Sequence, residues 1–277
     1  MLQLGKKQKL TVVKQMKFGI YLGEAKEAAE RVLLPLKEVP EGTKIGDQME
    51  VFLYLDSQDR MIATRRQPQA ELGGVAVLKV KEVSKIGAFL DWGLEKDLLL
   101  PFKEQTRHVY PGEQVLVAVY LDKSWRFCAT MNVYEYLDTD SPYKKDDHVT
   151  GTIYETGGGF GVFVAVDNRY SGLIPKREAT GRYQIGDSIS VRVTGVKPDG
   201  KLDLSPNERV EIQMDKDAEL ILRVIDEYEG VLPFGEKVSP EIINREFGIS
   251  KAAFKRAVGR LLKQGRIELT ENRIMKK

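Results

Sequence analysis

The sequence predicts a multidomain, mainly β protein, in which three five-stranded β-barrels in series are followed by a small α+β domain. Three observations support this prediction. A strand-like motif with an internal glycine occurs three times, two landmarks after it repeat with identical spacing, and the hydrophobic period becomes helical near residue 217. The chain has 277 residues, which is more than one compact domain usually needs.

The repeated motif defines three units. It reads "KFGIYLGEA" from Lys17, "KIGAFLDWG" from Lys85 and "GFGVFVAVD" from Gly159. Each copy is followed by an apolar run that ends in proline and then by a glycine turn, at Pro35, Pro101 and Pro175 and at Gly46, Gly112 and Gly186. Both landmarks are spaced by 66 and then by 74 residues, so they belong to one repeating unit.

Each unit is strand-like throughout. Segments such as "EVFLYLD" and "SVRVTGV" alternate or run apolar with β-branched residues, and Gly, Pro and Asp separate them. About five short strands result, which suits a small closed barrel and is short for a two-sheet sandwich. We place the units at residues 1–66, 67–137 and 143–209.

The last segment, residues 217–277, has a helical period. A helix from Asp217 ends at Gly230, and two short strands close the chain after residue 265. Serine caps and glycine stops bound two further helices, at Ser239, Gly248, Ser250 and Gly265. Three helices followed by a β-hairpin form the winged-helix arrangement.

The third of these helices has two distinct faces. Its core stripe is formed by Phe254, Val258, Leu261 and Leu262, and its cations fall together on the opposite face, at Arg256, Arg260 and Lys263. These cations are candidates for contact with a duplex groove or an RNA surface. An ordinary solvated basic face and a protein-docking module remain open alternatives.

The glycine motif itself has two interpretations. In a strict strand Phe18 would share a face with the apolar residues that fill the barrel, but Gly19 accepts bulge geometry and can turn both Phe18 and Tyr21 outward. Outward rings beside Lys17 suit single-stranded nucleic acid, because bases stack on rings and lysine meets phosphate. The alternative is that the rings simply fill the barrel.

The order of strands and motifs resembles the RNA-binding domain first named in ribosomal small-subunit protein one, the S-one domain. This resemblance implies a five-stranded oligonucleotide-binding (OB) barrel with the aromatics and an Asp-x-x-x-Arg pair on its binding face. The implied RNA-binding residues of unit one are Lys17, Phe18, Tyr21, Asp56 and Arg60.

Units two and three depart from this pattern. The RNA-binding residues that the resemblance implies for unit two are Lys85, Phe89, Asp122 and Arg126, with Ile86 in place of the first aromatic. Those implied for unit three are Phe160, Phe163, Lys197 and Lys201, with the two lysines in place of the Asp–Arg pair. A histidine common on the third strand of such domains is replaced by proline in all three units.

Three such barrels followed by a winged helix resemble the bacterial conserved virulence factor B family. The resemblance covers essentially the whole chain. It implies a cytoplasmic RNA-binding protein linked to the regulation of gene expression and virulence. The rings and lysines favour single-stranded RNA as partner, and the cations of the winged helix leave duplex nucleic acid open as a further partner.

Other classes lack support in the sequence. There is no phosphate loop, no histidine-based triad and no HExxH motif, so we expect no enzyme and no catalytic residue. One cysteine and two histidines provide no ligand-spaced cluster, so we expect no metal and no cofactor. No apolar run spans a bilayer and the N-terminus lacks a signal sequence, so we expect no membrane contact and a cytoplasmic location.

Charge limits the mode of nucleic-acid binding. The net charge of the chain is +2, and unit one carries twelve Lys and Arg against nine Asp and Glu. Such a chain binds phosphates modestly and must rely on stacking or on several modules at once. Two alternatives stay open: a winged-helix DNA-binding regulator with the barrels as interaction modules, and a factor that docks on the ribosome or polymerase.

Overall fold

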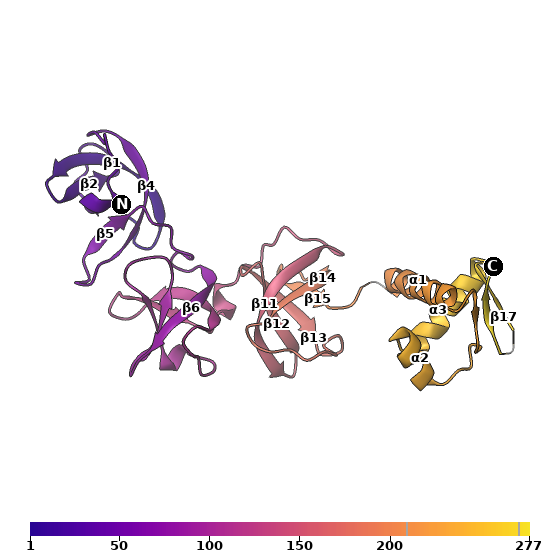
Figure 1. Ribbon diagram of the computed structural model, residues 1–277. Coiled ribbons are helices and arrows are strands. Elements are labelled where there is room, and N and C mark those ends of the chain that lie inside the picture. Colours follow the sequence, from indigo (N-terminus) through magenta and orange to yellow (C-terminus); the bar gives the residue numbers. More distant parts are fainter. Residues whose placement is uncertain (209, 271) are drawn as a thin grey trace. The chain divides into compact units, whose positions relative to one another are not determined.

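The computed structural model describes residues 1–208, 210–270 and 272–277. It forms two compact units, Met1–Pro206 and Asn207–Lys277. Figure 1 traces the chain through three β-barrels and then a helical domain. The predicted mainly β architecture is therefore confirmed. The predicted end of the third unit, Arg209, lies outside the described residues.

Barrel one closes with the strand order β1-β2-β3-β5-β4. Its elements are β1 (Lys7–Met16), β2 (Gly19–Gly23), β3 (Val32–Pro35), the 3-10 helix η1 (Leu36–Glu38), β4 (Gln48–Leu55) and β5 (Met61–Thr64). Alternate residues of β2 are buried and fill the barrel, among them Ile20 and Leu22. This inward alternation is what the apolar period of the motif predicts.

Barrels two and three repeat this topology. Barrel two has β6 (Val75–Val83), β7 (Gly87–Asp91), β8 (Leu98–Pro101), η2 (Phe102–Glu104), β9 (Gln114–Leu121) and β10 (Phe127–Thr130). Barrel three follows the 3-10 helix η3 (Tyr134–Tyr136) and has β11 (His148–Gly158), β12 (Gly161–Val166), β13 (Tyr170–Pro175), β14 (Ser188–Val196) and β15 (Leu202–Ser205).

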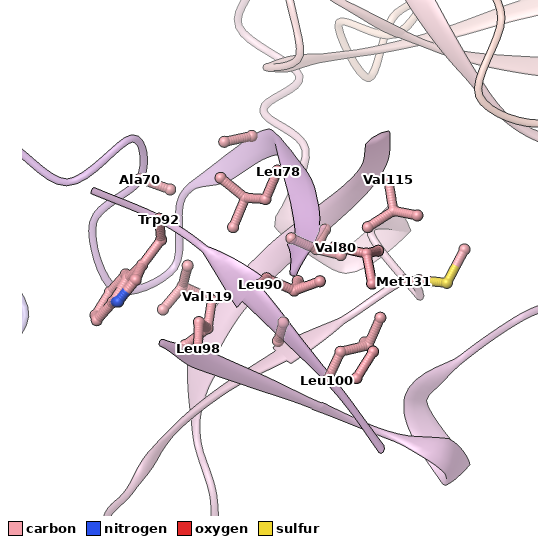
Figure 2. Packing of buried hydrophobic residues seen from close by; sticks show 14 of the residues in the cluster. Ala70, Leu78, Val80, Leu90, Trp92, Leu98, Leu100, Val115, Val119 and Met131 are labelled. Carbon is pink, nitrogen blue, oxygen red and sulfur yellow. The ribbon is translucent and has the colours of Figure 1, made fainter. Parts of the chain in front are cut away.

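The interior of barrel two is apolar. Figure 2 shows side chains such as Leu78, Leu90 and Leu100 gathered between its strands, and all three are fully buried. Trp92 extends this core, with its ring centroid 6.1 Å from that of Phe52 in barrel one. The two barrels thus share one hydrophobic cluster.

The motif glycine of each unit meets the proline landmark in space. The motif glycine at the start of the second strand is the register partner of the proline that ends the third, in the pairs Gly19–Pro35, Gly87–Pro101 and Gly161–Pro175. The three glycines have φ between 139° and 154°, and an added Cβ would lie 2.0–2.3 Å from a backbone carbonyl oxygen. Only glycine fits such a position, which explains why the motif repeats.

The bulge that the sequence places at this glycine lies elsewhere. In each barrel the register of the first strand skips one residue, after Val12, Val80 and Ile153. Barrel three has a second irregularity beside its glycine motif, between Glu155 and Gly158. The glycine turns the preceding side chain outward through its own positive φ, and the extra residue of the bulge sits on the neighbouring strand.

The described residues of the C-terminal domain form three helices and a three-stranded sheet of order β16-β18-β17. Its elements are α1 (Val210–Glu227), β16 (Val231–Leu232), α2 (Pro240–Phe247), α3 (Lys251–Lys263), β17 (Ile267–Leu269) and β18 (Ile274–Lys276). The predicted caps are confirmed, since the Ser239 and Ser250 hydroxyls accept hydrogen bonds from Ile242 N and Ala253 N. None of the helices among the described residues is long and apolar enough to cross a membrane.

Three details of this domain differ from the sequence prediction. The first helix begins at Val210 and not at Asp217, and the two-residue strand β16 was missed because so short a run has no measurable period. Leu262, placed in the core stripe, is 43% exposed, whereas Leu261 is fully buried. Successive residues of a helix point 100° apart, so Leu261 faces the core and the adjacent Leu262 faces away from it.

Candidate nucleic-acid interface

An outward-facing row of side chains crosses four strands in each barrel. In barrel one, Tyr21 on β2 is the register partner of Lys14 on β1 and of Leu33 on β3, and Leu33 is paired with Ile62 on β5. The corresponding rows are Glu82, Phe89, Leu99 and Cys128 in barrel two and Glu155, Phe163, Leu173 and Asp203 in barrel three, and of these residues Cys128 is buried. The motif aromatic therefore lies in the middle of one barrel face in all three repeats.

Barrel one presents two rings on this face. Phe18 is 52% exposed and Tyr21 is half-buried, and their ring centroids lie 6.4 Å apart at an interplanar angle of 86°. Lys14 and Lys17 are exposed beside them. Of the two interpretations of the glycine motif, the outward one describes barrel one, and the surface combines flat apolar rings with cations.

An Asp–Arg fork closes the last turn of barrel one. The Asp56 Oδ2 atom accepts hydrogen bonds from Arg60 Nε at 3.0 Å and from a terminal guanidinium nitrogen at 2.8 Å. Oδ1 accepts the backbone N–H groups of Gln58 and Arg60. Partial burial acts to raise the pKa of Asp56, but the hydrogen bonds from Arg60 and Gln58 outweigh it and lower the pKa.

The same fork occurs in barrel two between Asp122 and Arg126, at 3.2 and 2.9 Å. The pKa of Asp122 is likewise lowered, because hydrogen bonds from Arg126 and Ser124 outweigh the effect of burial. Each carboxylate is therefore committed to shaping its turn, while the exposed arginine keeps the N–H groups that do not face the fork. Only the arginines of these pairs can meet a phosphate.

Barrel three has a hollow of about 420 Å³ on this face. Its lining includes the predicted residues Phe160, Phe163, Lys197 and Lys201, and Phe160 is 74% exposed. Lys201 forms an ion pair with Asp199 at 3.0 Å, which raises the pKa of the lysine. The four residues that the sequence names for unit three are thus brought together.

The sequence prediction missed one ring of this hollow. Tyr134, from η3, also lines it, and its ring centroid lies 6.3 Å from that of Phe163. The Lys201 ammonium group sits 5.5 Å from the Tyr134 ring centroid, within cation–π range. Nothing in the repeat pattern indicates this residue, because it precedes the predicted start of unit three at residue 143.

A hollow of about 460 Å³ is lined by Phe89, Lys96 and Arg126 of barrel two, among others, and by residues of barrel one such as Asp59. Lys85 and Ile86 are exposed beside the motif glycine of barrel two, so the first aromatic of the pattern is absent here. A second missed residue, Trp125, is 71% exposed in the turn that carries the fork. Its signal in the sequence was an aromatic inside a polar turn, "DKSWR".

Charge differs among the three faces. The first-strand residue opposite the central ring is Lys14 in barrel one but Glu82 and Glu155 in barrels two and three. A carboxylate at this position repels a phosphate chain, and a lysine attracts it. Barrel one is therefore the most favourable of the three for an anionic strand.

Family models match the chain along almost its whole length. The S1 domain, which is the S-one domain above, matches residues 4–66 and 72–132. The second domain of virulence regulatory factor CvfB matches residues 134–207, and the CvfB-like winged helix domain matches residues 219–275.

Two relatives are similar to this chain over most of their length. YitL of Bacillus subtilis (strain 168) is 32% identical over 95% of this chain and 90% of that protein. The chain belongs to the conserved virulence factor B family. Conserved virulence factor B of Staphylococcus aureus (strain N315) is 26% identical over 83% of this chain and 80% of that protein. A crystal structure of a multidomain protein with nucleic acid binding domains from Streptococcus pneumoniae TIGR4 is 23% identical, with a TM-score of 0.49, and covers 99% of this chain and 98% of that chain.

Membership in this family places the chain among proteins built from nucleic-acid-binding modules, because OB-type barrels and winged helices both serve that purpose. The family's second-domain model begins at residue 134, so it includes Tyr134 together with barrel three. The hollow that contains Tyr134, Phe163 and Lys201 therefore lies within one matched domain.

The three predicted cations of the winged helix differ in exposure and in ion pairing. Arg256 and Lys263 are exposed on α3. Arg260 is instead half-buried and forms an ion pair with Asp215 of α1 at 2.6 Å. The helical period places all three on one face, but a partner on the neighbouring helix occupies Arg260, so two cations are left for a ligand.

Proposed function

We propose that this protein binds single-stranded RNA through its barrels, with barrel one as the principal site. The observation that carries the proposal is the exposed ring pair Phe18–Tyr21 with Lys14 opposite Tyr21 in the register. Bases stack on such rings regardless of sequence, and the lysines neutralise the phosphates between them. A duplex hides its base faces, so this surface favours a single strand.

The other modules assist in this proposal. Barrel three adds the rings and lysines of its hollow, although Glu155 weakens its attraction for phosphate. The winged helix adds the charge of Arg256 and Lys263. We further propose that the protein is a cytoplasmic regulator of gene expression without enzymatic activity, and the names of its relatives extend this proposal to virulence regulation.

The first test is a competition between nucleic acids. A labelled U-rich single-stranded RNA should be displaced by unlabelled single-stranded RNA at least about tenfold more effectively than by duplex DNA at physiological salt, because ring stacking contributes roughly 1–3 kcal/mol per base only for the single strand. Fluorescence anisotropy at stated salt measures both competitors. Equal competition by duplex DNA would support a winged-helix DNA-binding regulator instead.

A second test concerns the winged helix. The double substitution Arg256→Ala and Lys263→Ala should lower affinity for single-stranded RNA less than about tenfold and reduce the salt slope of log K by about 1.4, since two cations contribute charge without stacking. Arg260 is left intact because its ion pair with Asp215 supports the fold. Complete loss of binding in this variant would make the winged helix the main reader.

A further inference from the structure

The turn between β9 and β10 in barrel two has counterparts in the other barrels. In all three, the first residue of the turn donates its N–H to the carbonyl of the fifth: Asp56 to Arg60, Asp122 to Arg126 and Lys197 to Lys201. The fourth residue donates back to the first and has a positive φ. This left-handed position is held by Asp59 (57°), Trp125 (62°) and Gly200 (83°).

The residues at this position in barrels one and three have structural explanations. Aspartate tolerates left-handed backbone, and Asp59 forms an ion pair with Lys96 at 3.2 Å. Gly200 has no room for a side chain, because an added Cβ would lie 1.8 Å from the Thr139 carbonyl oxygen. Backbone tolerance and an ion pair therefore explain Asp59, and the lack of space for a side chain explains Gly200.

Trp125 has neither explanation. A bulky side chain is disfavoured at positive φ, so its presence costs conformational energy. Burial does not compensate, since the side chain is 71% exposed, and no hydrogen bond or ring contact joins its side chain to another residue of the part that the structure describes. A strained and exposed aromatic of this kind is characteristic of a contact surface.

The surroundings indicate which ligand the ring meets. Lys123 and Arg126 flank it, and Arg126 also lines the hollow that contains Phe89. Of the carboxylates nearby, Asp122 is held by Arg126, Asp97 by Lys81 and Asp59 by Lys96, which leaves Glu82 as the unpaired one in this lining. Cations beside a free ring complement an anionic strand whose bases stack.

We propose that Trp125 is a base-stacking platform of barrel two, supplying the ring that Ile86 fails to provide at the motif glycine. The proposal rests on the proposed single-stranded RNA binding and adds a second aromatic contact to it. Barrel two thereby takes part through its turn and not through its second strand. The strain at residue 125 is retained because the ring contacts ligand.

The chain contains only two tryptophans, which makes the test direct. Trp92 is 2% exposed and donates its indole N–H to the Lys96 carbonyl, but it also lines the hollow with Phe89 and Arg126, so its own response to ligand is measured in a variant that lacks Trp125. Titrating the full chain with a U-rich single-stranded RNA of about 12 nucleotides, within the site-size range of OB barrels, should quench the fluorescence of Trp125. The variant Trp125→Phe should lose this quenching and keep most of the affinity.

A second variant, Trp125→Asn, separates ligand contact from fold. Asparagine tolerates left-handed backbone, so the variant should have an unchanged or raised Tm and an RNA affinity lowered about 5- to 150-fold, the range of one stacked base. Tyr110→Ala is the matched control, because Tyr110 is a similarly exposed ring in the same barrel, on the turn before β9. This control should leave affinity unchanged.

The outcomes are distinct. A lower Tm with unchanged affinity in Trp125→Asn would make the ring structural and overturn the inference. Wild-type RNA binding without quenching, and with equal affinity in the variant, would overturn it while leaving the proposed function intact, and would point to a protein ligand for this turn. Absence of single-stranded RNA binding by the wild type would overturn both.

Discussion

Replacing Phe18 and Tyr21 together by alanine should weaken binding of single-stranded RNA by about 2–5 kcal/mol, while the chain stays folded. The size follows from two stacking contacts of roughly 1–3 kcal/mol each, with allowance for non-additivity. The fold should tolerate the change because Phe18 is 52% exposed and neither ring belongs to the buried cluster of barrel one. Fluorescence anisotropy gives the affinity, and thermal unfolding followed by circular dichroism gives the Tm.

A matched control distinguishes the ring pair from any exposed aromatic. Phe102 is exposed to a similar extent, at the start of η2 in barrel two, and lies outside the outward row of that barrel. Phe102→Ala should leave RNA affinity unchanged. If Phe18→Ala with Tyr21→Ala lowers the Tm strongly and leaves the affinity of the folded fraction intact, then the rings are architecture and barrel one is not the principal site.

The sequence predicted the fold well because its landmarks are steric requirements. The motif glycine and the proline, such as Gly161 and Pro175 in barrel three, recur in each repeat because they are register partners on adjacent strands. The backbone leaves no room for a side chain at the glycine. Three closed barrels followed from that spacing, and the helical domain followed from the helical period after residue 217. The bulge was placed on the wrong strand because a skipped register on β1 or β11 leaves no mark in the sequence of the glycine motif.

The candidate site was predicted less completely than the fold. The repeat pattern identifies residues at matching positions, so it found Phe160 and Phe163, and the resemblance to the S-one domain implied the Asp–Arg pairs. Tyr134 stands before the predicted start of unit three, and Trp125 replaces an aspartate of barrel one within the repeat. The sequence shows both rings, but it does not show that Tyr134 lines the hollow or that Trp125 is exposed at positive φ. The ion pair of Arg260 depends on which face of α1 packs against α3, which helical periodicity alone does not give.

The steric argument for the motif glycine leads to the second large effect. Gly161→Ala should destabilise barrel three by at least about 3 kcal/mol, from positive φ and from loss of strand contact. Its added Cβ would lie 2.0 Å from the Ile174 carbonyl oxygen and 2.8 Å from Lys176 N. Both atoms belong to the backbone, so relief requires β12 and β13 to separate rather than a side chain to rotate.

Gly159→Ala is the matched control for this substitution. It changes the same glycine-rich segment by the same methyl group, but nothing lies within 4 Å of the added atom and its φ is not in the left-handed range. Because a chain of several domains does not unfold in one step, hydrogen exchange is the suitable measurement. Gly161→Ala should lose amide protection across β11 to β15 while β1 to β5 keep theirs, and Gly159→Ala should resemble the wild type. Equal protection in the two variants would mean that the β12–β13 pair accommodates a side chain at residue 161. The glycine that repeats in all three barrels would then serve ligand contact rather than the barrel fold.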